Sequence, residues 1–282
     1  MRIHAGYEIT YESDVPTPML LQLAVHPSRE PDLLTPATMV FQPEIPATHY
    51  TDGFGNTCTR ITAPPGRLTI AMAFDVSDTG ATDEQAPDAV QHPIEDLPDE
   101  ALVFLLGSRY CETDKLGDTA WSLFGAVAPG WARVQAICDF VHQHIKFNYG
   151  DARSTRTAWE GYQEGKGVCR DYAHLAVAFC RCMNIPARYC TGYLGDIGMP
   201  PPYPPGDFSA WFEVYLGNRW YTFDARHNFP RIGRILIARG RDATDVAIST
   251  AFGSARLVGF HVVTDEVPDN EAAPNEAAPS AA

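Results

Sequence analysis

The sequence lacks several features that would assign it to common classes of protein. No apolar run is long enough to span a bilayer, and the first residues, MRIHAGYEITYE, do not follow the pattern of a signal peptide. Positive charge is scarce as well, because the 282 residues carry a formal net charge of −14. This excess of carboxylates argues against nucleic acids and anionic membranes as partners. We therefore expect a soluble chain that binds neither.

A disulfide framework and metal-ligand spacings are also missing. The seven cysteines are odd in number and irregularly spaced, which indicates reduced thiols and a cytoplasmic location. His142 and His144 form an HxH pair, and Cys180 and Cys182 form a CxC pair. Side chains two residues apart on a helix diverge by about 200°, so neither pair suits a shared metal ion. We expect no metal and no cofactor.

The most informative stretch is residues 165–183, GKGVCRDYAHLAVAFCRCM. Glycines at 165 and 167 interrupt the backbone, and apolar residues then recur at helical spacing. This pattern places Cys169 in the first turn of a buried helix, where unpaired N–H groups and the helix dipole favour a thiolate. The position alone leaves two interpretations open: a nucleophile with a lowered pKa, or a small buried apolar residue.

Downstream, the sequence predicts a β-hairpin. Residues 208–216 alternate between polar and apolar, meet Gly217-Asn218, and continue as residues 219–224. A two-residue turn would place Ser209 and Asp224 on the same face of the hairpin as diagonal neighbours. We expect the Cys169 sulfur to face this side of the hairpin.

Three segments together resemble the transglutaminase-like superfamily, which has a papain-like cysteine fold: GVCRDYAHL, NIPARYCTGYL and SAWFEVYLGNRWYTFDARHN. The resemblance runs from about Ala136 to Asn228, and the β-rich region before it resembles the N-terminal domain of bacterial members. It implies a catalytic triad with Cys169 as the nucleophile and Asp224 as the orienting acid. The position of the family's histidine corresponds to Ser209.

The serine matters because the histidine of such a triad accepts the thiol proton and later protonates the leaving group. A serine hydroxyl cannot accept a proton near neutral pH. Three interpretations follow: the chain uses another base, it is a binding protein on an enzyme's fold, or the serine is an engineered or chance substitution.

Few side chains could replace the missing base. His174 lies about 140° around the helix from Cys169 and should point away from it. Asp207 is close in sequence, but a carboxylate of ordinary pKa is a weak base toward a thiol. His227 could reach the site only if the chain turns sharply after Asp224, and it is kept as the alternative base. Arg226 could instead pair with Asp224 and leave that acid with no histidine to orient.

The chain divides into four parts. Alternating strands predict a β-sandwich over residues 1–80, followed by a linker over 81–98 that we expect to lie against the surface. The transglutaminase-like core is assigned to 99–264 and begins with a short helix for which Asp99 is the expected cap. The Glu-Ala-Ala-Pro repeats predict a disordered tail over 265–282.

Further features flank the predicted site. The proline-dense loop 195–206 comes just before Ser209 and either forms a wall of the cleft or is a passive connection. Tyr149 and Trp159 either line the cleft or are core aromatic residues, and the backbone N–H of Cys169 is the expected oxyanion donor. Five arginines either form a docking patch for an acidic group or pair with surplus carboxylates; we favour pairing for Arg226, Arg231, Arg234, Arg239 and Arg241.

Together these observations predict an α+β protein in which an N-terminal β-sandwich precedes a papain-like transglutaminase core, with an antiparallel sheet packed on the catalytic helix. The predicted function is acyl chemistry on an amide of a protein or peptide, including a glutamine side chain. Cys169 would form a thioester that is released to water or to an amine. The alternative is a non-catalytic binding protein that retains the cleft. The sequence leaves the oligomeric state open.

Overall fold

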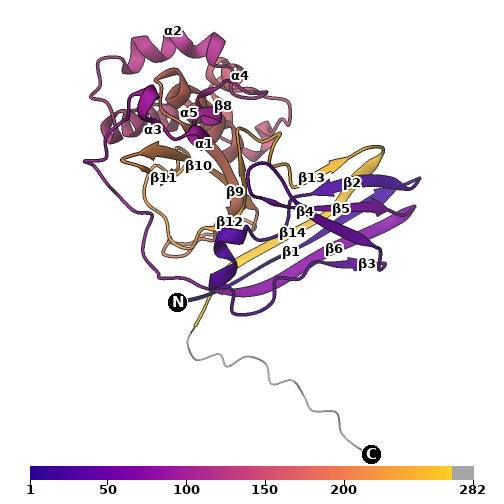
Figure 1. Ribbon diagram of the computed structural model, residues 1–282. Coiled ribbons are helices and arrows are strands. Elements are labelled where there is room, and N and C mark those ends of the chain that lie inside the picture. Colours follow the sequence, from indigo (N-terminus) through magenta and orange to yellow (C-terminus); the bar gives the residue numbers. More distant parts are fainter. Residues whose placement is uncertain (269–282) are drawn as a thin grey trace, which may run out of the picture.

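The computed structural model describes residues 1–268, which form a β-sandwich and a helix-covered sheet (Figure 1). The sandwich has two four-stranded sheets, ordered β14-β1-β6-β3 and β13-β2-β5-β4. Apolar side chains from both sheets fill one core, in which Ile9, Leu21 and Ile70 are buried. The strands are β1 Arg2–Ser13, β2 Thr17–Leu21, β3 Val40–Gln42, β4 Ala47–Thr51, β5 Thr57–Ala63, β6 Gly66–Ser77, β13 Ser249–Ala251 and β14 Ala255–Val267.

The last two strands return to the sandwich instead of completing the predicted core. β13 pairs with β2, and β14 pairs with β1 along its whole length, so the yellow β14 lies beside the indigo β1 in Figure 1. The range 99–264 assigned to the core therefore includes strands of the sandwich, and the tail predicted from residue 265 begins inside β14. Residues 269–282 of that tail lie outside the described residues.

The core is a sheet of order β11-β10-β9-β12, with all its pairs antiparallel. Helix α5 packs on it, sharing a buried cluster with Phe212, Val214 and Phe223, and α2, α3 and α4 contact α5 in turn. No helix within residues 1–268 is both long and apolar enough to cross a membrane. The strands are β9 Ala187–Tyr193, β10 Phe208–Leu216, β11 Arg219–Phe223 and β12 Ile235–Gly240, with a short parallel pair of β7 Lys146–Phe147 and β8 Lys166–Gly167.

The helices confirm the predicted start of α5 but include α2 and α4, to which the sequence analysis assigned no helix. They are α1 Asp99–Leu102, α2 Thr113–Phe124, α3 Trp131–His144, α4 Ala158–Glu164 and α5 Cys169–Cys182, with short 3-10 turns at Pro27–Asp32, Ile94–Asp96, Val103–Leu105 and Tyr149–Asp151. Helix α2 buries Leu116, Ala120 and Phe124, one side chain per turn, a sparse pattern interrupted by Gly117. The expected cap of α1 was wrong, because Pro98 is the N-cap and Asp99 is already helical.

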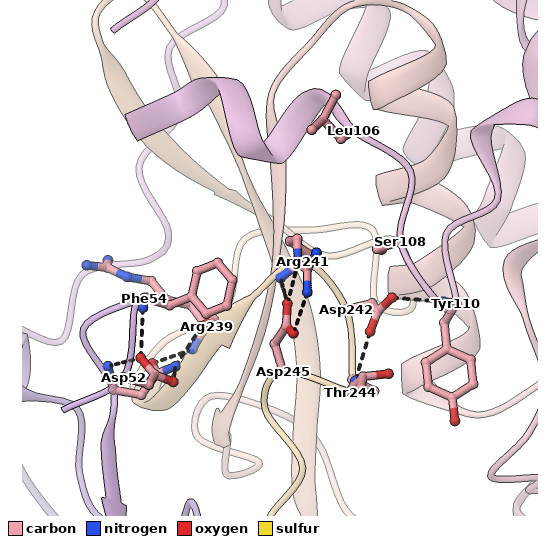
Figure 2. Close-up of polar contacts among 12 residues, drawn as sticks. Asp52, Phe54, Leu106, Ser108, Tyr110, Arg239, Arg241, Asp242, Thr244 and Asp245 are labelled. Atoms are coloured by element: carbon pink, nitrogen blue, oxygen red, sulfur yellow. Dashed lines mark hydrogen bonds and ion pairs between the residues drawn. The ribbon is translucent and has the colours of Figure 1, made fainter. Parts of the chain in front are cut away.

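Polar contacts lie where the sandwich meets the core (Figure 2), and the two parts also share an apolar cluster. The buried Asn56 side chain exchanges hydrogen bonds of 2.8 and 2.9 Å with the backbone of Arg239 on β12. Next to this contact, within the core itself, Asp242 accepts the backbone N–H of Tyr110 at 2.8 Å. Beneath these contacts the Phe74 and Tyr193 rings meet with their centroids 5.6 Å apart. The sandwich is thus packed directly on β9 and β12.

The segment between the two parts lies against the core, as expected for the linker over 81–98. Thr82 forms an isolated bridge with Ile232, and the Asp83 N–H donates to the Arg231 carbonyl at 2.8 Å. Farther along, the Val90 carbonyl accepts the N–H of Gly217 at 2.9 Å. These contacts hold the linker over the hairpin.

Candidate active site

Cys169 is the first residue of α5, and its position is fixed by the turn that precedes it. Gly165 ends α4 in the left-handed conformation, with φ of 61°. The Asp171 carboxylate then accepts the Val168 N–H at 2.8 Å and pairs with Arg156 at 3.0 Å. Because Asp171 satisfies the first free donor of α5, the helix begins at the cysteine.

The thiol of Cys169 is half-buried and is not the activated thiolate that the sequence analysis expected. Burial raises the pKa of Cys169 to about 11. The Arg226 guanidinium and the backbone N–H of Ala210 act in the opposite direction, whereas the Asp207 and Asp224 carboxylates add to the rise. The expectation of a lowered pKa was wrong because loss of water around the sulfur outweighs the donors that surround it. At neutral pH the thiol is protonated.

The hairpin has the predicted turn and register. Gly217 and Asn218 both have positive φ, 54° and 67°, as a type I′ turn requires. Pairing runs from Leu216 with Arg219 to Phe212 with Phe223. Alternation then puts Ser209 and Asp224 on one face of the hairpin and Phe212 on the other, where α5 packs.

The Cys169 sulfur therefore contacts the backbone at the start of β10. Contrary to the expectation from the sequence, it does not face the side of the hairpin that bears Asp224. The sulfur accepts the N–H of Ala210, the residue after Ser209, and Asp224 acts on its pKa. The body of α5 packs on the alternate side chains of β10. The thiol and the acid therefore approach the first residues of β10 from different sides.

Ser209 does not reproduce the contacts of a triad histidine. Its side chain is buried, and within residues 1–268 its hydroxyl has no hydrogen-bond partner. It therefore makes no hydrogen bond with the Asp224 carboxylate or with the Cys169 thiol.

Asp224 is instead surrounded by donors from residues that follow it in sequence. One carboxylate oxygen accepts His227 Nδ1 at 2.8 Å and Arg234 Nη2 at 3.0 Å. The other accepts the backbone N–H groups of Arg226 and His227 at 3.0 and 3.1 Å. Burial alone would raise the pKa of Asp224, but the Arg234 guanidinium and His227 hold it well below its usual range. The acid is ionised and orients a histidine.

His227 reaches Asp224 because the chain turns sharply where β11 ends. The Asn228 N–H donates to the Asp224 carbonyl at 2.8 Å, and Asn228 has a positive φ of 57°. This turn meets the condition that the sequence analysis set for His227. Its ring is 17% exposed and lines a cavity together with Ser209.

The side chain of Arg226 does not pair with Asp224, so that expectation was wrong. Its guanidinium lies over the Phe147 ring, 4.1 Å from the centroid, and acts on the Cys169 thiol. Arg234 makes the ion pair with Asp224, and it also binds Asp83 at 2.9 Å. Sequence reasoning included Arg234 only in a basic run, since no local pattern relates it to residue 224.

A cavity of about 490 Å³ lies beside Ser209 and His227, and neither Cys169 nor Asp224 is among its lining residues. Ser209, Arg226 and His227 line one side, and the proline-dense loop 195–206 supplies another wall, as one of its two interpretations predicted. The end of β14, residues 261–266, completes it and was not anticipated. Tyr149 is in the lining, whereas Trp159 is not and packs on Tyr162 at 6.0 Å.

His174, His142 and His144 make hydrogen bonds to the backbone of other segments and do not line this cavity. His174 accepts the Ala243 N–H at 3.1 Å, and burial lowers its pKa to about 3. His142 and His144 bind separate carbonyl oxygens, those of Arg226 and Tyr162. In the part of the chain that the structure describes, no group of three or more His, Cys, Asp or Glu residues could hold a metal ion.

Comparison with known proteins agrees with this architecture. A family model described as the transglutaminase-like superfamily matches residues 122–225. The crystal structure named "putative cysteine protease", from Cytophaga hutchinsonii, is 30% identical, covers 96% of this chain and 92% of its own, and superposes with a TM-score of 0.83. The periplasmic domain of TgpA from Pseudomonas aeruginosa is 14% identical over 79% of this chain and 90% of its own, with a TM-score of 0.38.

A protein of Mycobacterium leprae (strain TN) is 35% identical over 88 residues, which is 29% of this chain and 30% of that protein. The shared segment thus spans less than a third of the relative. The family model, the likeness to the Cytophaga hutchinsonii protein over nearly the whole chain, and the cysteine at the start of α5 lead to one conclusion. The chain belongs to the transglutaminase-like superfamily.

Proposed function

We propose that the protein is a cysteine-dependent hydrolase or acyltransferase that acts on an amide, with His227 as the base in place of the histidine missing at position 209. The observation that carries this proposal is the 2.8 Å hydrogen bond from His227 Nδ1 to the buried Asp224 carboxylate. This bond fixes the tautomer and leaves Nε2 as the proton acceptor. His227 also lines the cavity beside Ser209, the position where the family's base would stand.

Cys169 supplies the nucleophile. Because burial raises its pKa to about 11, the thiol does not ionise by itself near neutral pH and needs a base during the reaction. The Arg226 guanidinium and the Ala210 N–H both stabilise the thiolate as it forms. Arg226 and Tyr149 line the cavity, and both interact electrostatically with Cys169. The thiol therefore lies near the cavity in which a substrate would bind.

The reaction proceeds in two halves. The Cys169 sulfur attacks the amide carbonyl while His227 Nε2 takes the thiol proton, and that proton passes to the nitrogen as the C–N bond breaks. The backbone N–H of Cys169 donates to the oxyanion. Water or an amine then attacks the thioester, gives its proton to His227, and the C–S bond breaks with the proton returned to sulfur. The substrate class we propose is a protein or peptide amide, including a glutamine side chain.

One observation favours a second candidate, a binding protein that recognises an amide without turnover. The resting thiol is neutral, and Ser209, whose buried hydroxyl has no hydrogen-bond partner within residues 1–268, lines the cavity. In that case a glutaminyl peptide binds in calorimetry but is not converted. The two candidates differ in turnover and not in where the peptide binds.

The experiment compares hydrolysis of p-nitrophenyl acetate and release of ammonia from a glutaminyl peptide. Cys169→Ala should abolish both, and His227→Ala should lower kcat/KM by about 10²–10⁴-fold, the usual contribution of a general base. The matched control is His49→Ala, which removes an exposed histidine of β4 and should change neither rate. An unchanged rate in His227→Ala would assign the base elsewhere, and no turnover by the wild type would support the binding protein.

A further inference from the structure

A second cavity lies on the face of the core sheet opposite α5. Its volume is about 280 Å³, and its floor is formed by β10, β11 and β12, including Trp211 and Leu236. Residues 28–29 and 78–83 close it from above. It contains neither the thiol nor His227, and its size is near the lower end of the range for small-molecule sites, roughly 300 Å³.

Four arginines and three carboxylates, those of Asp78, Asp83 and Glu213, line this cavity in a protein whose net charge is −14. Arg29 pairs with Asp32 and Asp78, and Arg234 pairs with Asp83 and Asp224, so these two have carboxylate partners. Arg231 lies 3.8 Å from the Asp196 carboxylate, and Arg239 has no carboxylate partner among the described residues. The expectation that the basic run pairs with surplus carboxylates therefore holds for Arg231, Arg234 and Arg241 but not for Arg226 or Arg239.

Arg239 is the clearest exception. Within residues 1–268 its guanidinium makes no hydrogen bond and no ion pair, although its backbone is held by Asn56. Burial and the neighbouring Arg188 guanidinium both lower the pKa of Arg239. Glu213 acts in the opposite direction but is bound by Arg188 at 2.5 Å. The Arg239 guanidinium is therefore half-buried and has no acceptor of its own in the described part of the chain, with Glu213 as its opposing charge.

Two buried N–H groups of the same cavity wall also lack acceptors. The Arg231 and Arg234 side chains are only 2% and 8% exposed, yet Arg231 Nε and Arg234 Nη1 have no hydrogen-bond partner among the described residues. The other nitrogens of each are used: Arg231 Nη2 donates to the Gly195 carbonyl, and Arg234 is fixed between two carboxylates. Unpaired buried donors of charged groups are costly, and these two are held rigidly in place.

We infer that this second cavity binds the oxyanion of a small molecule, a phosphate or carboxylate group, between Arg231, Arg234 and Arg239. Guanidinium groups match both oxyanions in geometry and in charge. The anion would accept the two unused N–H groups and neutralise the unpaired charge of Arg239. Trp211 and Leu236 provide an apolar floor for the remainder of the ligand. The inference does not depend on the chemistry proposed for Cys169.

The test is a titration of the full chain with inorganic phosphate and, separately, with acetate, at constant ionic strength. Isothermal calorimetry should show saturable binding of at least one anion, and the melting temperature should rise with its concentration. Stronger binding of phosphate would indicate a phosphorylated ligand, and stronger binding of acetate a carboxylate. Absence of saturable binding of both anions would overturn the inference.

The variant Arg239→Gln separates binding from a structural role. It should weaken anion binding at least tenfold, while its melting temperature without anion should be equal to or above that of the wild type, because a half-buried charge without an ion-pair partner among the described residues is removed. The matched control is Arg60→Gln, an exposed arginine of β5 outside the cavity, which should bind the anion as the wild type does. Equal weakening in both variants would show non-specific charge attraction and contradict the site.

Discussion

The two cavities differ in charge although one ionised carboxylate, Asp224, is linked to both. The cavity with His227 is lined by more carboxylates, including Asp207, Asp265 and Glu266, than arginines. The cavity on the opposite face of the sheet is lined by four arginines and three carboxylates, so arginines outnumber carboxylates there. Asp224 orients His227 toward the first and is bound by Arg234 from the second. Under the two proposals, an amide and an oxyanion are recognised separately on one sheet.

The comparison also shows why Asp224 is the residue on which both cavities depend. Its carboxylate accepts four donors, two of them from charged or chargeable side chains. A histidine at position 209 would have to share an acid that Arg234 and His227 already occupy. In this chain the acid serves residues that follow it in sequence instead of the residue on the neighbouring strand.

Of the substitutions considered, Asp224→Asn should have the largest effect, because Asp224 is linked to both cavities. It leaves the buried Arg234 guanidinium without half of its counter-charge and replaces one of the two acceptor oxygens, each of which accepts two donors, by an NH2 group. We expect a loss of about 3–5 kcal/mol in the free energy of unfolding at pH 7, measured in urea. Asp14→Asn, at an exposed position, should stay within about 0.5 kcal/mol of the wild type.

The effect of Asp224→Asn should depend on pH in a defined direction. The folded-state pKa of Asp224 is held well below its usual range, so its contribution is complete above the unfolded value of about 3.9 and is lost as pH falls toward the folded value. The difference between wild type and variant should therefore shrink below about pH 4. A difference that grows on acidification would contradict the proposed ion pairs.

Ser209→His tests whether the cavity lined by His227 lacks a working base. If His227 is the working base, a histidine at 209 should change the hydrolysis rate of p-nitrophenyl acetate by less than about tenfold, because Asp224 is already engaged. A rise of about 10² or more would mean that the wild type has the cleft but no base. Ser209→Ala is the control for loss of the hydroxyl.

Arg226→Gln should change the reactivity of the thiol by a smaller amount. Arg226 lowers the pKa of Cys169, so its removal should raise that pKa and slow iodoacetamide labelling at pH 8 by up to about tenfold, the change expected for one pKa unit. Peptide mass spectrometry measures the rate at Cys169. Arg67→Gln, whose side chain is 72% exposed in the sandwich, should label like the wild type, and equal slowing in both would remove Arg226 from the site.

Ser209→Ala should have the smallest effect. The buried hydroxyl makes no hydrogen bond within residues 1–268, so its removal should change the free energy of unfolding by no more than about 1 kcal/mol, in either direction. A larger loss would indicate a hydrogen-bonded partner. Thermal unfolding at pH 7 is sufficient to measure it.

Much of the fold could be predicted because its signals are local. Glycines and helical periodicity specify that α5 starts at Cys169, and Gly217-Asn218 specifies the turn and register of the hairpin. The return of β14 to β1 could not be predicted, since alternation shows that a strand exists but not which strand it pairs with. Helix α2 was missed because its apolar pattern is sparse.

The site was less predictable than the fold because its chemistry depends on contacts between distant residues. The Cys169 position was clear, but its raised pKa comes from burial that no local pattern shows. Arg234 reaches Asp224 only because residues 225–234 fold back on the sheet. The sharp turn at Asn228, with positive φ, was the one local signal that could have favoured His227 earlier.

The most direct test of the central claim is to trap the acyl intermediate. The protein is mixed with p-nitrophenyl acetate, quenched in acid, and analysed by intact mass and peptide mapping. The account predicts one acetyl group on Cys169, removed by hydroxylamine as expected for a thioester, and strongly reduced in His227→Ala. Substrate turnover without an adduct on Cys169, or an acetyl group at Cys182 instead, would contradict it.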